Sequence, residues 1–370
     1  MDAGVANAER REPSVVQMPA SLRDRIGQMM MVGFRGLTPR EAQPTLRNID
    51  AGVVGAVVLF DVDAETGGPR NIASPDQVRD LVSGLKSAGS IPVLVTVDAE
   101  GGFYHRLKER YGFAPATPAA TLGERDDLEF TRAEARRTAG ELARVGIDMN
   151  ISPVVDLLNP ANLTISARRR SFAAEPDAVA RQAREFILGH HDLGILTAAK
   201  HFPGMRGVLQ PYSPGVGEVV ESWTPSELDP YRALLAEGLL DAVLATRATH
   251  PEIDATSPSC LSEKVVEGQL RSELGFDGVV ITDAMEMLPI WDVYGFERGT
   301  IKAVQAGCDL ILFCNESGIV PYSDDIAPDA ARVIVEAVER GEISEERIER
   351  SCRRILALKA RALGRSERPA

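Results

Sequence analysis

The chain has 370 residues, of which 44% are hydrophobic, so it can bury a large core. This length suits a single (β/α)8 barrel, which typically has about 250 residues and reaches about 400 with insertions. The formal net charge of -13 argues against binding to nucleic acid or to an anionic membrane surface, because a polyanion would be repelled on average.

Residues 1–20 carry mixed charges and no continuous apolar run, so they do not resemble a signal peptide. We expect them to form a disordered tail, followed by one barrel domain over residues 21–365 and a poorly ordered SERPA end. No stretch reaches the roughly 18 apolar residues of a membrane span, which predicts a soluble, cytoplasmic protein. The four cysteines follow no C-x-x-C spacing, so neither a zinc site nor a disulfide framework is indicated.

Short apolar runs alternate with longer amphipathic segments, a pattern typical of repeated βα units and a parallel sheet. The intervening segments, such as DQVRDLVSGLKSAG, repeat apolar residues every three or four positions and end at glycine, as helices do. The stretch 329–363 predicts two closing helices, the second capped by Ser344. The apolar runs predict eight strands, at 28–34, 54–60, 91–98, 146–155, 195–202, 241–248, 278–285 and 308–314.

Eight strands with interleaved helices favour a closed TIM-type (β/α)8 barrel, although strand number alone leaves an open doubly wound sheet as an alternative. The first strand is not followed by G-x-G-x-x-G, which removes the commonest nucleotide-binding version of that sheet. Active sites of barrels lie at the C-terminal ends of the strands. Carboxylates and cations gathered there suit a ligand rich in hydroxyl groups, such as a sugar. The polar residues at these ends are Asp98, Glu100, Asp156, Lys200, His201, Arg247, His250, Asp283 and Glu286.

From about Leu22 to about Leu363, the local sequences resemble glycoside hydrolase family 3, in particular its single-domain bacterial β-N-acetylhexosaminidases. AAKHFPG is the most specific match. VDAEGGFYHRL resembles the family motif D-x-E-G-G-x-x-x-R, and IDMNISPVVDL resembles N-x-x-P-V-x-D. RRRSFAAEPDAVA is similar to R-S-F-G-x-D-P, with Ala173 in place of the glycine. LSEKVVEGQLRSELGFDGVVITDAMEM resembles the nucleophile strand with its helix, and GEISEERIERSCRRILALK the C-terminal helix.

This resemblance implies that Asp283 is the nucleophile, which would attack the anomeric carbon and form a covalent glycosyl-enzyme. The alternative for Asp283 is a cap of the following helix. The resemblance further implies a small carbohydrate or glycoside as partner. No metal or organic cofactor is expected, because His and Cys are sparse and the chemistry needs none. The oligomeric state is not indicated. Residues implied to hold the sugar hydroxyls are Asp98, Arg106, Arg170, Lys200 and His201.

Four of these five sugar-holding residues also have a purely structural alternative. Lys200 and His201 could belong to a buried ion pair in the barrel mouth. Arg106 and Arg170 could form ordinary surface pairs, which contribute little.

The loop after the fifth strand departs from the family pattern. In the single-domain branch it carries the acid/base His with its Asp, in a pattern like K-H-F-P-G-H-G-D-T followed by D-S-H. Here it reads KHFPGMRGVLQPYSPGVGEVV, so Met205 replaces the earlier His. Aligned without gaps, Pro211 and Ser213 stand at the positions of that Asp and His. No histidine occurs between His201 and His250.

The acids nearest in the sequence are Glu218, Glu221 and Glu227, and Arg247 in LATRATH replaces the His of the family's M-T-A-H. One interpretation is that Glu218 or Glu221 has taken over the acid/base role, the alternative for each being an ordinary solvated carboxylate. A second is a substrate that needs little acid assistance, or sugar transfer to another acceptor, with Arg247 contacting a phosphate or carboxylate.

The third interpretation is a non-catalytic sugar-binding protein. Loss of acid/base catalysis costs about 10²–10⁴-fold, so weak residual activity fits all three interpretations. The sequence therefore predicts a family 3-type retaining glycosidase for β-N-acetylhexosaminides or related β-glycosides, with Asp283 and Glu218 as catalytic candidates and with Arg247 at the substrate.

Overall fold

The computed structural model describes residues 17–213, 217–316, 318 and 320–366. The expected disordered N-terminal tail falls largely on residues 1–16, outside the described part, as do residues 367–370 of the C-terminal end. Within the described residues, eight parallel strands form one sheet in the order β11-β8-β5-β4-β3-β2-β1-β12. Each lies inside one of the eight predicted runs, which confirms the strand prediction. Their bounds are β1 (Met30–Gly33), β2 (Ala56–Leu59), β3 (Leu94–Val97), β4 (Met149–Asn150), β5 (Leu196–Phe202), β8 (Ala242–Ala245), β11 (Val279–Thr282) and β12 (Ile311–Phe313).

The two ends of this sheet meet and close it into a barrel. Strand β12 pairs in parallel with β1, and Ile281 of β11 forms a parallel bridge with Leu310, the residue before β12. The Thr282 N–H donates to the Leu310 carbonyl at 3.0 Å, and the Met285 N–H donates to the Leu312 carbonyl at 2.9 Å. The predicted TIM-type barrel is therefore confirmed, and an open sheet is excluded.

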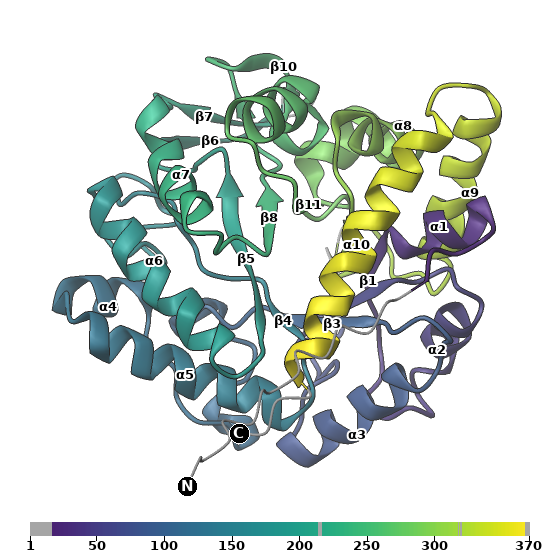
Figure 1. Ribbon diagram of the computed structural model, residues 1–370, viewed down its shortest axis with the longest axis horizontal. Coiled ribbons are helices and arrows are strands. Elements are labelled where there is room, and N and C mark those ends of the chain that lie inside the picture. Colours follow the sequence, from purple (N-terminus) through teal and green to yellow (C-terminus); the bar gives the residue numbers. More distant parts are fainter. Residues whose placement is uncertain (1–16, 214–216, 317, 319, 367–370) are drawn as a thin grey trace, which may run out of the picture.

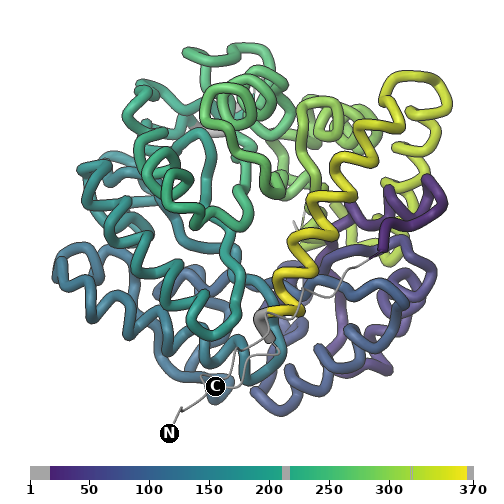
Figure 2. The backbone as a smooth tube through the Cα atoms, in the orientation of Figure 1, coloured from purple at the N-terminus to yellow at the C-terminus, as the bar shows by residue number. Residues whose placement is uncertain are grey.

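Helices surround the strands as an outer ring (Figure 1), and the chain passes around this ring in sequence order (Figure 2). Local sequence explains several helix starts. Ser74, just before α3, forms a capping box with Gln77 in its first turn, and Ser344 accepts a hydrogen bond from the Arg347 N–H at 3.2 Å. The helices are α1 (Leu22–Gln28), α2 (Gln43–Asp50), α3 (Pro75–Lys86), α4 (Ala119–Arg125), α5 (Leu128–Arg144), α6 (Pro176–His191), α7 (Asp229–Ala236), α8 (Leu288–Ala306), α9 (Ile326–Glu339) and α10 (Glu345–Ser366).

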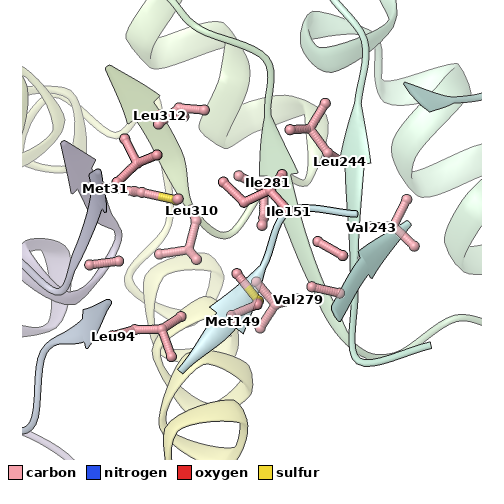
Figure 3. Packing of buried hydrophobic residues seen from close by; sticks show 14 of the residues in the cluster. Met31, Leu94, Met149, Ile151, Val243, Leu244, Val279, Ile281, Leu310 and Leu312 are labelled. Carbon is pink, nitrogen blue, oxygen red and sulfur yellow. The ribbon is translucent and has the colours of Figure 1, made fainter. Parts of the chain in front are cut away.

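The core consists of apolar strand residues that fill the barrel and of helix residues that cover it from outside. Figure 3 shows side chains such as Met31, Met149, Ile151 and Ile281 meeting inside the barrel. Because helices also cover the outer face, the strands are buried on both faces and have continuous apolar sequences. This explains why the strands appear in the sequence as uninterrupted apolar runs.

A smaller sheet, which the sequence analysis did not predict, covers part of the barrel mouth. Its strands come from the segments that follow β5 and β8, and its order is β10-β9-β7-β6. Strands β6 and β7 form an antiparallel hairpin within the atypical loop after β5. The bounds are β6 (Val208–Ser213), β7 (Gly217–Glu221), β9 (Thr249–His250) and β10 (Asp254–Pro258).

Helix α10 lies across the opposite, N-terminal end of the barrel and crosses in front of it in Figure 1. Arg354 pairs with Asp277 at 2.7 Å, just before β11, and Arg361 pairs with Asp241, just before β8. With this end covered, the C-terminal end is left as the mouth. No helix in the described part of the chain has the length and apolar composition needed to cross a membrane.

Candidate active site

Asp283 directly follows β11 at the C-terminal end of the barrel. Its Oδ2 accepts hydrogen bonds from the backbone N–H and Nη1 of Arg247, each at 3.1 Å, and its Oδ1 accepts one from the Ala284 N–H at 2.9 Å. Burial would raise the pKa of Asp283, but the charges of Arg247 and His201 outweigh it and hold the pKa below its ordinary value. Helix α8 begins at Leu288 without a side-chain cap, so Asp283 does not cap it.

Glu218 reaches the same place from strand β7. Its Oε2 lies 2.9 Å from Nη2 of Arg247, whose Nη1 holds Asp283. The side chains of all three residues are only 14–16% exposed. One guanidinium therefore holds a carboxylate at each of its terminal nitrogens, which makes Glu218 and Asp283 near neighbours.

The two other acids of this loop have different surroundings. Glu221 ends β7 and is exposed. Glu227 is buried and accepts hydrogen bonds from the N–H groups of Arg206 at 2.8 Å and Thr224 at 3.2 Å, and burial raises its pKa to about 7. Of these three acids, Glu218 is the one that pairs with Arg247 beside Asp283.

Lys200 lies at the end of β5 between two carboxylates. Its Nζ donates to Oδ1 of Asp98 at 2.7 Å and lies 2.6 Å from Oε1 of Glu100. Burial would lower the pKa of Lys200, but the charges of Asp98 and Glu100 outweigh burial and raise it. Burial alone would likewise raise the pKa of Glu100, but Arg170 and Lys200 together lower it. This network matches the structural alternative for Lys200, a buried ion pair in the barrel mouth. The role of Lys200 in holding the sugar therefore stays a prediction.

Arg170 connects this network to His201. Its Nε and Nη2 donate to the two carboxylate oxygens of Glu100, both at 2.8 Å, and Nη2 lies 3.2 Å from Nε2 of His201. The other ring nitrogen of His201 lies 2.7 Å from Oδ2 of Asp156. The guanidinium also lies 4.4 Å from the centroid of the Tyr104 ring. Arg170 is 7% exposed, so it does not form a surface pair.

Arg106 is the remaining predicted sugar-holding residue. Its Nη1 donates to Oδ1 of Asp61 at 3.3 Å, and Lys108 donates to the other carboxylate oxygen. Burial would lower the pKa of Arg106, but the charges of Asp98, Glu316 and Asp61 outweigh it and raise the pKa. The sequence analysis missed Asp61 and Glu316. Asp61 comes two residues after β2 and Glu316 three residues after β12, so the strand-end rule that selected the other candidates would have found them.

Two other residues at the strand ends are held by protein groups. The ring nitrogens of His250 lie 2.7 Å from the Gly204 carbonyl and 2.8 Å from Oγ of Ser259, and burial lowers its pKa to about 4. Glu286 is 1% exposed and accepts a hydrogen bond from the Asn315 N–H at 2.5 Å, and burial raises its pKa to about 7. Both therefore have a clear structural role in the loops around the mouth.

Comparison with known proteins assigns this arrangement to a family. Residues 21–358 match the model of the glycosyl hydrolase family 3 N terminal domain. A β-hexosaminidase of Idiomarina loihiensis is 31% identical over 75% of this chain and 82% of its own length.

Solved structures give the same assignment. The structure of a family 3 β-N-acetylglucosaminidase from Paenibacillus sp. is similar with a TM-score of 0.83 and 34% identity, over 95% of this chain and 64% of that one. A β-N-acetylhexosaminidase from Beutenbergia cavernae is similar with a TM-score of 0.80 and 29% identity, over 92% of this chain and 99% of that one. The chain thus spans a little under two thirds of the Paenibacillus structure and nearly all of the Beutenbergia one. With a match over most of its length and the charged residues of the barrel mouth in place, this chain belongs to glycosyl hydrolase family 3.

Proposed function

We propose that the protein hydrolyses β-linked N-acetylhexosaminides with retention of configuration, with Asp283 as the nucleophile and Glu218 as the acid and base. The observation that carries the proposal is the pairing of both carboxylates with Arg247, at 3.1 and 2.9 Å. Retaining glycosidases hold two carboxyl groups about 5–5.5 Å apart, and two groups bound to one guanidinium are compatible with that spacing. The names of the relatives support an N-acetylhexosaminide as the substrate.

In the first step, a carboxylate oxygen of Asp283 bonds to the anomeric carbon while the bond from that carbon to the leaving oxygen breaks. A protonated Glu218 gives its proton to this oxygen. In the second step, water loses a proton to Glu218 and attacks the anomeric carbon, which releases the Asp283 carboxylate. The lowered pKa of Asp283 supports its part, because only the ionised carboxylate is nucleophilic.

The charged residues on the far side of the mouth would bind the sugar. Asp98, after β3, and Lys200 and His201, at the end of β5, offer acceptors and donors. Arg170 holds His201, and Arg106 donates to Asp61. Their mutual ion pairs fix the side chains before the sugar arrives, which lowers the entropy lost on binding.

The interpretation that Arg247 contacts an anionic group of the substrate finds less support. Both terminal nitrogens of its guanidinium already pair with carboxylates of the protein. A phosphate or carboxylate on the substrate would have to replace one of them. We therefore assign Arg247 to holding the catalytic pair.

Covalent trapping tests this function. The wild-type protein is incubated with a ring-fluorinated N-acetylglucosaminyl fluoride, which slows the second step more than the first. We expect intact mass spectrometry to show one added sugar and peptide mapping to locate it on Asp283. The variant Asp283→Asn is the control and should stay unmodified.

Two outcomes would contradict the proposal in different ways. An adduct on another residue would remove Asp283 as the nucleophile. Binding of N-acetylglucosamine, measured by calorimetry, without any adduct or turnover would favour the non-catalytic sugar-binding protein.

A further inference from the structure

The hairpin of β6 and β7 rests on a small apolar cluster that is separate from the core of the barrel. This hairpin cluster gathers side chains that are each at most 2% exposed, from the segments after β4, β5 and β8. Because it buries apolar surface from three segments at once, it holds the hairpin against the barrel mouth. Its members are Val154, Ile165, Met205, Val220 and Ala248.

Val220 connects the hairpin cluster to Glu218. The two residues are two positions apart in β7, so their side chains point to the same face of the strand. Val220 is fully buried, whereas Val219 and Glu221 on the other face are partly and largely accessible. The burial of Val220 therefore turns Glu218 toward the mouth, where its carboxylate meets Arg247.

Met205 connects the same cluster to Arg247. Its Sδ accepts a hydrogen bond from Oγ1 of Thr246 at 3.2 Å, and the backbone N–H of Ala248 donates to that same hydroxyl at 3.3 Å. Thr246 and Ala248 are the two chain neighbours of Arg247. The residues on both sides of Arg247 are thus tied to the cluster that also buries Val220.

The backbone of Met205 is itself fixed by the segment after β4. Its N–H donates to Oδ1 of Asp156 at 2.9 Å, and its carbonyl accepts a hydrogen bond from Nδ2 of Asn162 at 2.7 Å. The same Nδ2 donates to the carbonyl of Gly207, directly before β6, at 2.8 Å. Met205 is therefore a fixed point to which both the hairpin and the segment of Arg247 are attached.

We propose that Met205 is a positioning residue that aligns Glu218 with Arg247 for proton transfer. This inference rests on the proposed function and adds how its acid and base is held in place. Met205 stands where the family pattern has the first His of this loop, and a polar ring buried among apolar side chains is unfavourable unless it is hydrogen-bonded. The replacement therefore supplies an apolar seat for a hairpin that carries a carboxylate.

Leaving groups of different acidity test this alignment. A dinitrophenyl N-acetyl-β-glucosaminide reacts without protonation of its leaving oxygen, whereas the β-linked disaccharide of N-acetylglucosamine needs an acid. Met205→Ala leaves a cavity under the hairpin, so Glu218 loses its fixed position. We expect kcat/KM to fall about 10- to 100-fold for the disaccharide, as for a catalytic group displaced by about 1 Å, and less than about 3-fold for the dinitrophenyl glycoside.

Companion variants separate positioning from general stability. Met205→Leu keeps most of the apolar volume and should restore most of the activity on the disaccharide. Val220→Ala should change the ratio of the two kcat/KM values in the same direction as Met205→Ala, and it removes fewer atoms, so it keeps the test open if Met205→Ala does not fold. Val219→Ala is the matched control on the opposite face of β7 and should keep the wild-type ratio.

A second control addresses the loss of stability alone. Met29 is fully buried directly before β1, at the end of the barrel away from the mouth. Met29→Ala should lower the midpoint of thermal unfolding, as Met205→Ala does, but should leave the ratio of the two kcat/KM values unchanged. In the Glu218→Gln background, Met205→Ala should have no further effect on the disaccharide, because it acts through that carboxylate.

The failure of this inference and the failure of the proposed function give different results. If the wild-type protein hydrolyses neither substrate, or if Glu218→Gln leaves the ratio unchanged, the proposed function fails. If Glu218→Gln changes the ratio but Met205→Ala and Val220→Ala do not, the positioning role is overturned while the function stands. Equal losses on both substrates in Met205→Ala also overturn it, since Met205 then does not act through the acid.

Discussion

Arg247 binds Asp283 twice, through its backbone N–H and through Nη1, both at 3.1 Å from the same carboxylate oxygen. Because the backbone and side chain of one residue grip one oxygen, the Asp283 carboxylate is fixed in orientation as well as in charge. The sequence shows at this position only that Arg247 replaces a His of the family pattern. The structure adds that the replacement pairs with the candidate nucleophile and with Glu218 together.

The first prediction concerns the charge on Arg247. In Arg247→Met, Asp283 loses the larger of the two charges that oppose the effect of burial, so the pKa of Asp283 should rise. Below that pKa the carboxyl group is protonated and cannot attack, so the acid limb of kcat/KM should move to higher pH by about one unit. The measurement is a pH profile with an aryl N-acetyl-β-glucosaminide. Arg79→Met, on the exposed face of α3, should keep the wild-type profile, and an unmoved limb in Arg247→Met would contradict the assignment.

The second prediction concerns Glu218. Glu218→Gln should lower kcat/KM about 10²–10⁴-fold for a disaccharide, because the leaving oxygen is no longer protonated. The loss should be much smaller for the first step with a good leaving group, and added azide should restore turnover, since azide needs no general base. Glu221→Gln is the matched control on the same strand, and its carboxylate is exposed. An equal loss in both variants, or none in Glu218→Gln, would rule out Glu218 as the acid and base.

The third prediction concerns stability. Lys200→Met leaves Glu100 and Asp98 without their shared cation in a buried site, and removing one partner of a buried ion pair costs about 3–5 kcal/mol. The free energy of unfolding in urea should fall by that amount. Lys264→Met is the comparison, because the Lys264 side chain is 69% exposed and its Nζ makes only a loose contact with Oδ1 of Asp254, at 3.8 Å. This substitution should change the free energy of unfolding by less than about 0.5 kcal/mol. Similar losses in the two variants would show that Lys200 is not tightly coupled to the carboxylates.

The fourth prediction concerns pH and Glu286. Burial raises its pKa from 4.5 to about 7 in the folded protein. The folded state therefore holds this proton more tightly than the unfolded state, so the stability is fully present below about pH 4.5 and is lost as the pH rises through 7. Glu286→Gln has no proton to lose, so it should be more stable than wild type at pH 8, by about 1 kcal/mol or more, and should gain little at pH 4. Urea midpoints at both values test this, and an equal effect at both would contradict the raised pKa.

The barrel strands could be predicted from the sequence, because the barrel interior buries one face of each strand and the surrounding helices bury the other. It did not predict the small sheet of β6, β7, β9 and β10. Segment 208–221 is rich in proline and glycine, and its pairing with β9 is a contact between loops that are distant in the sequence.

Part of the candidate site could likewise be predicted from the sequence, and part could not. The ends of the strands can be found from the sequence. Because polar residues at the C-terminal end of a barrel strand face the mouth, these ends identify Asp98, Lys200, His201, Arg247 and Asp283 as candidates. The ion-pair partner of each of these residues cannot be found in this way, because an ion pair depends on the direction of the side chains and on distances across the barrel. Asp61 and Glu316 were missed although they follow strands, and the pairing of Glu218 with Arg247 depends on how the hairpin folds over the mouth.

By itself the sequence therefore determined the barrel, the family and Asp283 at the end of its seventh strand, since these depend on local apolar patterns and short motifs. Only the tertiary structure decided which acid of the rewritten loop lies beside Asp283 and which rim side chains stay exposed. The physical reason is that hydrogen bonds and ion pairs act over a few ångströms in space, whereas Glu218, Arg247 and Asp283 are far apart in the sequence and meet only when the loops close over the barrel mouth.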